Sequence, residues 1–266
     1  MTDGLMFQLL AYLRWWLRSG TAHGLHSPFV YGLYTTVICH DGHFAAYARA
    51  EARRQALLAS EHMLEVCDFG AGSRVAGAGT RRRAVRDIAR HAAKPPRLAQ
   101  LLFRLVNHFR PATVLELGTS LGLTTAYLAL AATRARVVTF EGCPATAAVA
   151  RDTFAELNLR NVELVEGNLD QTLPATLAGL PQPLDFVFFD GNHRYEPTLR
   201  YFEQCLARAH EDSVFVLDDI HWSAEMEQAW AAIKAHPAVT VTVDLFYVGL
   251  VFFRKKQPRQ DFWLRY

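Results

Sequence analysis

The chain of 266 residues lacks the cysteine patterns of small disulfide-rich proteins and of zinc sites. It has four cysteines and no C-x-x-C pair; they are Cys39, Cys67, Cys143 and Cys205. Scattered single cysteines are typical of free thiols, which persist in a reducing compartment. We therefore expect a cytoplasmic protein without a disulfide framework.

Long hydrophobic runs are also missing. The most apolar stretch near the N-terminus, residues 5–17, is interrupted by Gln8 and Arg14 and is too short to span a bilayer. It has neither the basic flank nor the small-residue cleavage site of a signal peptide. The stretch is expected to form an amphipathic helix that packs on the body of the protein, so we expect no membrane partner.

The chain has little net charge, +2 in total, which predicts no strong attraction to nucleic acid or membrane. The two parts of the chain differ, however. Residues 1–110 contain 15 basic and 7 acidic side chains, whereas residues 111–266 contain 13 and 19. The basic front can complement the acidic back within one chain or across a homodimer.

The pattern of apolar residues changes near Pro95-Pro96. Before it, helical spacing predominates, over residues 5–18, 28–38, 43–65 and 80–93. After it, short β-type runs are expected at 113–117, 136–140, 162–165, 184–189, 214–217, 239–245 and 250–253. Helices are expected between many of them, at 98–109, 120–132, 144–157, 195–209 and 223–236.

Strands that alternate with helices predict an α/β fold, namely a Rossmann-like, doubly wound sheet of seven mostly parallel strands. Only residues 246–249 separate the last two strands, which is too short for a crossover, so the last strand should be antiparallel. We expect residues 1–96 to form a helical cap or lid and residues 97–266 to form the sheet domain. The basic segment 254–260 is expected to be a solvated end.

Two glycine-rich segments follow β-type runs, and only one has the context of a ligand-binding loop. The segment 66–73 (VCDFGAGS) leads into no second strand, so Asp68–Ser73 is expected to be a turn or lid element. The segment 115–122 (LELGTSLG) leads into a helix and then a strand that ends in Glu141, about 20 residues later. A carboxylate in that place suits a ribose.

The spacing in this loop differs from that of dinucleotide-binding proteins. Those proteins use G-x-G-x-x-G, in which the middle glycine allows close approach of a pyrophosphate. Here the pattern is E-x-G-x-x-x-G, with Thr119 and Ser120 where the middle glycine would fall. The loop therefore suits a cofactor that carries an amino group and no phosphates.

The region 113–254 resembles the class I S-adenosylmethionine-dependent methyltransferases. The resemblance depends on motifs in the order and spacing of that family: LELGTSLG (115–122), TFEG (139–142), EGN (166–168), FDGNH (189–193) and LDDIH (217–221). The whole chain is also similar to a bacterial group of metal-dependent O-methyltransferases. This resemblance implies S-adenosylmethionine as the cofactor.

The resemblance also implies which residues bind the cofactor. Residues 118–122 would wrap its methionine end, with Glu116 near the amino group, while Glu141 would accept both ribose hydroxyls and Asn168 would lie near the adenine edge. The full set of cofactor-binding candidates is Glu116, Gly118, Thr119, Ser120, Gly122, Glu141, Gly142, Asn168 and Asp190.

Three carboxylates follow neighbouring strands of the expected sheet. Asp190 ends one strand, and Asp218 and Asp219 end the next. Converging carboxylates repel one another unless a cation bridges them, and oxygen ligands favour Mg²⁺, Ca²⁺ or Mn²⁺. These three residues are our candidate metal ligands, for Mg²⁺ or another divalent cation, and they match the pattern of the metal-dependent O-methyltransferases.

Two histidines follow these carboxylates. His193, three residues after Asp190, resembles the base of sugar-modifying members of that group, because a neutral imidazole can accept the proton of a metal-bound hydroxyl near pH 7. We therefore predict His193 and Asp190 as catalytic residues. His221 is the second candidate base.

The expected function is thus O-methylation of a small-molecule or sugar-like hydroxyl, assisted by a divalent metal and a histidine base. Three alternatives remain open: a metal-independent methyltransferase that works by positioning alone, a nucleic-acid methyltransferase that uses the arginines at 81–90, and a protein that binds S-adenosylmethionine without turnover. The sequence after Asp190 is GNH rather than Pro-Pro-aromatic, which argues against nucleic acid as a substrate.

Overall fold

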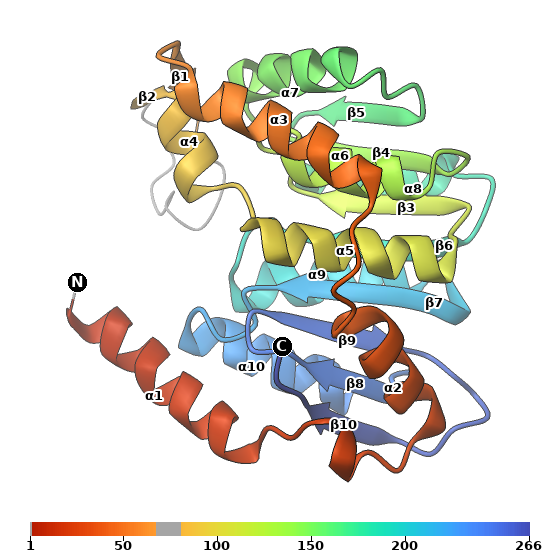
Figure 1. Cartoon of the computed structure of the whole chain (residues 1–266). Coiled ribbons are helices and arrows are strands. Elements are labelled where there is room, and N and C mark those ends of the chain that lie inside the picture. Colours follow the sequence, from red (N-terminus) through yellow and green to blue (C-terminus); the bar gives the residue numbers. More distant parts are fainter. Residues whose placement is uncertain (1, 68–80) are drawn as a thin grey trace. The chain divides into compact units, whose positions relative to one another are not determined.

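The computed structural model describes residues 2–67 and 81–266 (Figure 1). The expected turn at Asp68–Ser73 lies outside the described residues. The chain divides into two compact units, His40–Gln182 and the combination of Met1–Cys39 with Pro183–Tyr266. The first is the middle unit and the second is the terminal unit.

The middle unit contains three parallel strands, β3 (Thr113–Leu117), β4 (Arg136–Glu141) and β5 (Val162–Glu166), in the order β3-β4-β5. All five residues of β3 are buried, as expected for a parallel strand covered on both faces. The helices of this unit are α3 (Ala45–Ala59), α4 (Val85–His91), α5 (Pro96–Phe109), α6 (Leu123–Ala131), α7 (Pro144–Glu156) and α8 (Leu169–Gly179). A separate antiparallel pair is formed by β1 (Met63–Val66) and β2 (Arg81–Ala84).

The terminal unit contains five strands in the order β6-β7-β9-β8-β10. Their bounds are β6 (Leu184–Phe189), β7 (Ala209–Asp218), β8 (Val241–Asp244), β9 (Val248–Phe252) and β10 (Gln260–Trp263). Strands β6 and β7 are parallel, whereas β9 is antiparallel to both β7 and β8. The mixed α/β class with a mostly parallel sheet and an antiparallel strand is therefore confirmed.

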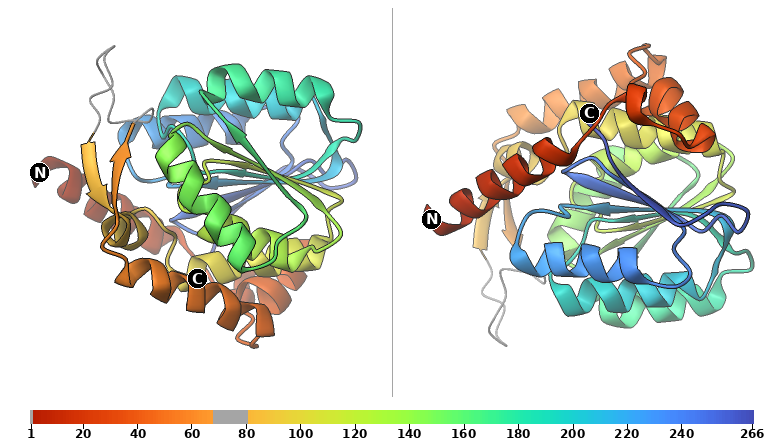
Figure 2. Two further views of the ribbon diagram at one scale, coloured as in Figure 1. Left: turned by 90° about the horizontal axis from the view of Figure 1, so that it is seen from above. Right: turned by 90° about the horizontal axis from the view of Figure 1, so that it is seen from below.

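Helices cover both faces of the sheet in the terminal unit. They are α1 (Thr2–Arg18), α2 (Pro28–Leu33) with the π-helical turn Tyr34–Ile38, α9 (Tyr195–Leu206) and α10 (Ala224–Ala235). Figure 2 shows α9 and α10 side by side on one face, with α1 and α2 on the opposite face. Of the helices among the described residues, none is both long enough and apolar enough to cross a membrane.

Local sequence explains where several helices begin. Ser27 and Ser223 accept hydrogen bonds from the backbone of the first turns of α2 and α10 through their side-chain oxygens. Pro28 and Pro96 stand in first turns, where a missing N–H costs nothing. Acidic side chains in the first turn of α10 and Lys234 in its last turn complement the helix dipole.

The structure corrects four expectations. The predicted helix 43–65 ends at Ala59 and is followed by β1, and the predicted helix 80–93 begins with β2. Residues 169–179, where no helix was predicted, form α8 around Pro174. The predicted solvated end is followed by a strand that was not predicted, β10, which pairs in parallel with β8.

Gly249, the second residue of β9, should not tolerate a side chain. A Cβ there would lie 2.6 Å from the ring of the buried Trp230. We expect Gly249→Ala to lower the free energy of unfolding by about 1–3 kcal/mol through overpacking, measured by urea denaturation. As a control, Gly179→Ala adds a Cβ with no heavy atom within 4 Å and should leave stability unchanged or slightly raised. Equal stabilities of the two variants would contradict this account.

Candidate active site

The loop between β3 and α6 adopts a backbone conformation that requires glycine. Gly118 and Gly122 have φ angles of 112° and 79°, and Ser120 between them has a φ of 50°. At Gly122 a Cβ would also lie 2.7 Å from the ring of Phe154. A non-glycine residue with positive φ, such as Ser120, is held only when its surroundings compensate for the strain. The loop at the carboxyl end of β3 therefore has a specific conformation that depends on its two glycines.

Glu141 holds this loop to the end of β4. One carboxylate oxygen accepts a hydrogen bond from the backbone N–H of Ser120 at 2.8 Å, and the other accepts from the N–H of Cys143 at 2.9 Å. Burial raises the pKa of Glu141, and the backbone hydrogen bonds from Cys143, Ser120 and Gly142 only partly offset that increase. A carboxylate has about four lone-pair sites, so the three backbone donors leave capacity for a further donor.

Glu116 lies beneath the loop and is fully buried. One of its oxygens accepts hydrogen bonds from the hydroxyls of Thr125 on α6 and Thr139 on β4. The hydroxyl of Thr139 lies 2.6 Å from that of Thr119, which belongs to the loop itself. This buried network connects the loop, through Thr119, Thr139 and Glu116, to the neighbouring strand and helix.

Asn168 caps α8. Its side-chain oxygen accepts a hydrogen bond from the N–H of Asp170 at 2.9 Å. The preceding Gly167 has a φ of 128°, and its N–H donates to the carbonyl of Glu141. The turn that carries Asn168 is thus tied to the end of β4. Of the predicted cofactor-binding residues, Gly118, Thr119, Ser120, Gly122, Glu141, Gly142 and Asn168 lie on these tied loops of the middle unit.

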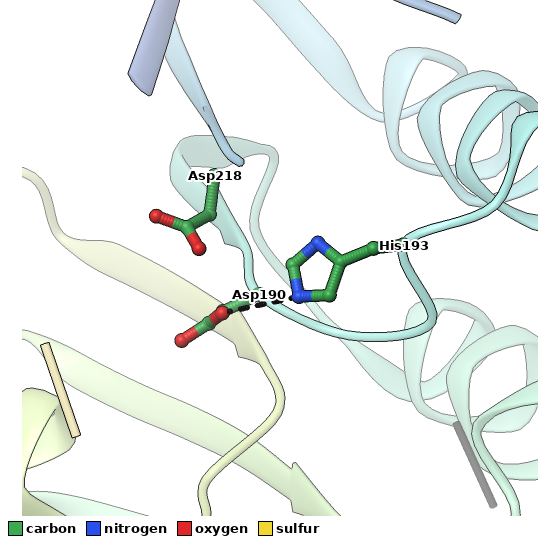
Figure 3. A group of neighbouring side chains, drawn as sticks. All are labelled: Asp190, His193 and Asp218. Atoms are coloured by element: carbon green, nitrogen blue, oxygen red, sulfur yellow. Dashed lines mark ion pairs between the residues drawn. The ribbon is translucent and has the colours of Figure 1, made fainter. Parts of the chain in front are cut away.

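In the terminal unit, Asp190, His193 and Asp218 come together. One ligand atom from each lies within 4.8 Å of the others. Asp190 follows β6, His193 lies in the loop before α9, and the buried Asp218 ends β7. Figure 3 shows the imidazole of His193 directed toward Asp190, with Nε2 at 3.6 Å from the carboxylate. The structure therefore brings together three of the four residues predicted for metal and base chemistry.

Asp219 is not part of this group. It has a left-handed backbone conformation, with a φ of 53°, and its N–H donates to the carbonyl of Tyr247 at 2.7 Å. The chain turns sharply at this residue, so consecutive aspartates at the end of β7 occupy different environments. The sequence had treated them as equivalent because adjacent residues at a strand end carry no sign of such a turn.

The carboxylates of this group could hold a divalent cation, because the ligand atoms of the three residues lie within 4.8 Å of one another. Two carboxylates suit a hard cation such as Mg²⁺ or Mn²⁺. Carboxylate ligands alone would leave positions for water or for a substrate oxygen, with His193 beside them.

His221, the second candidate base, is engaged at both ring nitrogens. Nδ1 lies 2.8 Å from a carboxylate oxygen of Glu227, and Nε2 lies 3.0 Å from one of Asp244. Burial alone would lower the pKa of His221, but the hydrogen bonds and charges of Asp244 and Glu227 raise it above its ordinary value. The ring also stacks on Phe246. With both nitrogens occupied, His221 is poorly placed to accept a proton from a substrate.

Sequence reasoning missed Asp244. This residue is buried at the end of β8, and its carboxylate accepts hydrogen bonds from Trp230, His221 and the N–H of Phe246. The available signal was the one used for Asp190 and Asp218, an acidic residue at the end of an apolar strand. It was overlooked because the residue stood inside the predicted strand 239–245.

Comparison with known proteins supports this assignment of elements. Residues 115–220 match a family model described as a methyltransferase domain. Solved structures with the same fold include an O-methyltransferase from Bacillus cereus in complex with SAH, at 18% identity over 84% of this chain and 96% of that one, with a TM-score of 0.56. The O-methyltransferase TomG from Streptomyces achromogenes, involved in tomaymycin synthesis and solved with SAM, is 20% identical over 85% and 95%, with a TM-score of 0.54.

A third similar structure is an SAH-bound methyltransferase from Podospora anserina, at 14% identity over 87% of this chain and 98% of that one, with a TM-score of 0.59. At these identities the likeness establishes the fold. Residues 115–220 thus match a methyltransferase domain, and the chain has the fold that these methyltransferase structures share.

Proposed function

We propose that the protein transfers the methyl group of S-adenosylmethionine to a hydroxyl oxygen of a small molecule or a sugar-like acceptor, with the help of a divalent cation. The observation that carries this proposal is the convergence of Asp190, His193 and Asp218 at the carboxyl ends of two parallel strands. The O-methyltransferases among the similar structures support oxygen as the acceptor atom.

In this proposal the loop 118–122 and Glu141 bind the cofactor. Glu141 accepts the two ribose hydroxyls, and the backbone hydrogen bonds that it already receives hold it in place. Asp190 is a further candidate contact. Residues 97–266 act as the cofactor-binding domain, and residues 1–96 act as a cap that helps to select the acceptor.

The acceptor hydroxyl must lose its proton as its oxygen attacks the methyl carbon and the carbon–sulfur bond breaks. Asp190 and Asp218 would hold the cation, with Asp219 as a further candidate ligand. A bound divalent cation lowers the pKa of a coordinated hydroxyl. His193 takes the proton at Nε2, the nitrogen that faces Asp190, and the carboxylate stabilises the imidazolium that forms. Free thiols at all four cysteines agree with action in the cytoplasm.

Replacing Glu141 by alanine should abolish measurable binding of S-adenosylmethionine in calorimetry. The variant loses the acceptor of two ribose hydroxyls and also releases Ser120 from the strained loop. Glu163→Ala, on the neighbouring strand β5, removes an exposed carboxylate and serves as the control, with affinity close to that of the wild type. An affinity of Glu141→Ala equal to that of the wild type would refute the assignment of this loop.

The affinity for S-adenosylmethionine should also depend on pH through Glu141. Only the ionised carboxylate accepts both hydroxyls, so affinity is complete above its pKa and is lost as the pH falls through it. Because burial raises the pKa of Glu141 above 4.5, this loss should begin at a higher pH than for an ordinary glutamate. Calorimetry from about pH 4.5 to about pH 7.5 would measure the loss of affinity, since this range begins near the ordinary pKa of a glutamate. The Glu141→Gln variant should bind more weakly and without this dependence; identical profiles would contradict the assignment.

Calorimetric titration with Mn²⁺ or Mg²⁺ should show one saturable site. We expect Asp218→Asn to weaken binding at least about ten-fold, because a buried ligand loses its charge. The variant Asp212→Asn changes an exposed aspartate in the same strand β7 and should bind as the wild type does. Methyl transfer by the wild type without any metal binding would support the metal-independent alternative instead.

A further inference from the structure

A second concave site lies in the terminal unit, apart from the group of Asp190, His193 and Asp218. It is a cavity of about 250 Å³ between α1, α10 and the ends of β8 and β10. Three tryptophans, Trp15, Trp230 and Trp263, line it. Drug-sized ligands occupy pockets of about 300–1,000 Å³, so this cavity suits a molecule of one or two rings.

The aromatic walls are held in place by Asp244. The indole N–H of Trp15 donates to the backbone carbonyl of Asp244 at 3.3 Å, and that of Trp230 donates to its carboxylate at 3.0 Å. Trp263 packs on the cluster formed by Trp15, Ala11 and Phe246. Two of the three rings thus have fixed orientations before any ligand binds, which lowers the entropic cost of binding.

The charges around the cavity favour an anion. The two acidic residues of its lining, Glu227 and Asp244, are both hydrogen-bonded to His221, and Arg14 lies 3.8 Å from Glu227. Lys234 and Arg18 also line the cavity, and neither forms an ion pair with an acidic residue in the described part of the chain. Two cations are therefore left to receive a negative group.

A cationic ligand would compete with Lys234 for the tryptophan rings. The ammonium of Lys234 lies 5.0 Å from the ring centre of Trp263 and 5.6 Å from that of Trp230, within the range of a cation–π interaction. The ammonium thus already serves as the cation that interacts with these two rings, and its charge repels a second cation. An anion gains from the same ammonium, while flat indole surfaces favour a planar apolar body.

We propose that this cavity binds a planar aromatic carboxylate, with its ring against the indoles and its carboxylate paired with Lys234 and Arg18. The proposal does not depend on methyl transfer, because none of the residues proposed for the cofactor or the metal takes part in it.

Calorimetry of the full chain with 2-naphthoate, compared with the neutral 2-naphthamide of the same shape, would test the proposal. We expect one saturable site for naphthoate and at least about ten-fold weaker binding of the amide, since one charge-assisted pair contributes about that factor. Lys234→Met, which keeps the apolar stem, should lose a similar factor. Arg18→Met should lose less, because Arg18 is exposed.

Lys255→Met removes an exposed lysine outside the cavity and is the matched control, with wild-type affinity expected. Thermal unfolding of each variant would separate loss of binding from loss of folding. Equal binding of acid and amide would show adsorption on apolar surface, such as the exposed leucines of α1, and would overturn the proposal. So would the absence of binding to the folded wild type, or tighter binding of benzyltrimethylammonium than of naphthoate.

Discussion

Parallel pairing of strands is the constraint on which the functional part of this protein depends. It sets the carboxyl ends of paired strands at one edge of a sheet, where the chain leaves each strand and turns. In the middle unit this edge carries Glu141 and the glycine loop after β3. In the terminal unit it carries Asp190 and Asp218. The acidic residues are far apart along the chain, and only strand pairing makes them neighbours within each unit.

The loops at these edges hold their shape through hydrogen bonds to side chains that are also candidates for chemistry. Glu141 illustrates this double use, because its carboxylate fixes Ser120 and Cys143 while retaining lone pairs for a ligand. Glu116 shows the opposite case. Its burial and its two threonine donors make it part of the support beneath the loop. Two glutamates that the sequence placed in one category therefore have different surroundings.

Much of the fold followed from the periodicity of apolar residues. The strand over residues 113–117 and its neighbours were predictable because strands buried on both faces appear as short apolar runs. The hairpin of β1 and β2 was missed, since its three consecutive arginines resemble an exposed helical face and its strands are far apart in sequence. Helix α8 was missed because Pro174 usually interrupts a helix. Strand β10 was missed because its sequence is partly polar and does not resemble a strand. It is a strand because it pairs with β8.

The sequence by itself determined the class of the fold, the loop with its two necessary glycines, and the acidic residues that end the strands. These features depend on local spacing, which a linear pattern records. Tertiary structure alone decided that Asp219 lies outside the group of Asp190, His193 and Asp218, and that His221 lies between Glu227 and Asp244. The physical reason is that side-chain direction after a strand depends on backbone turns and on partners from distant elements, neither of which leaves a repeating signal in the sequence.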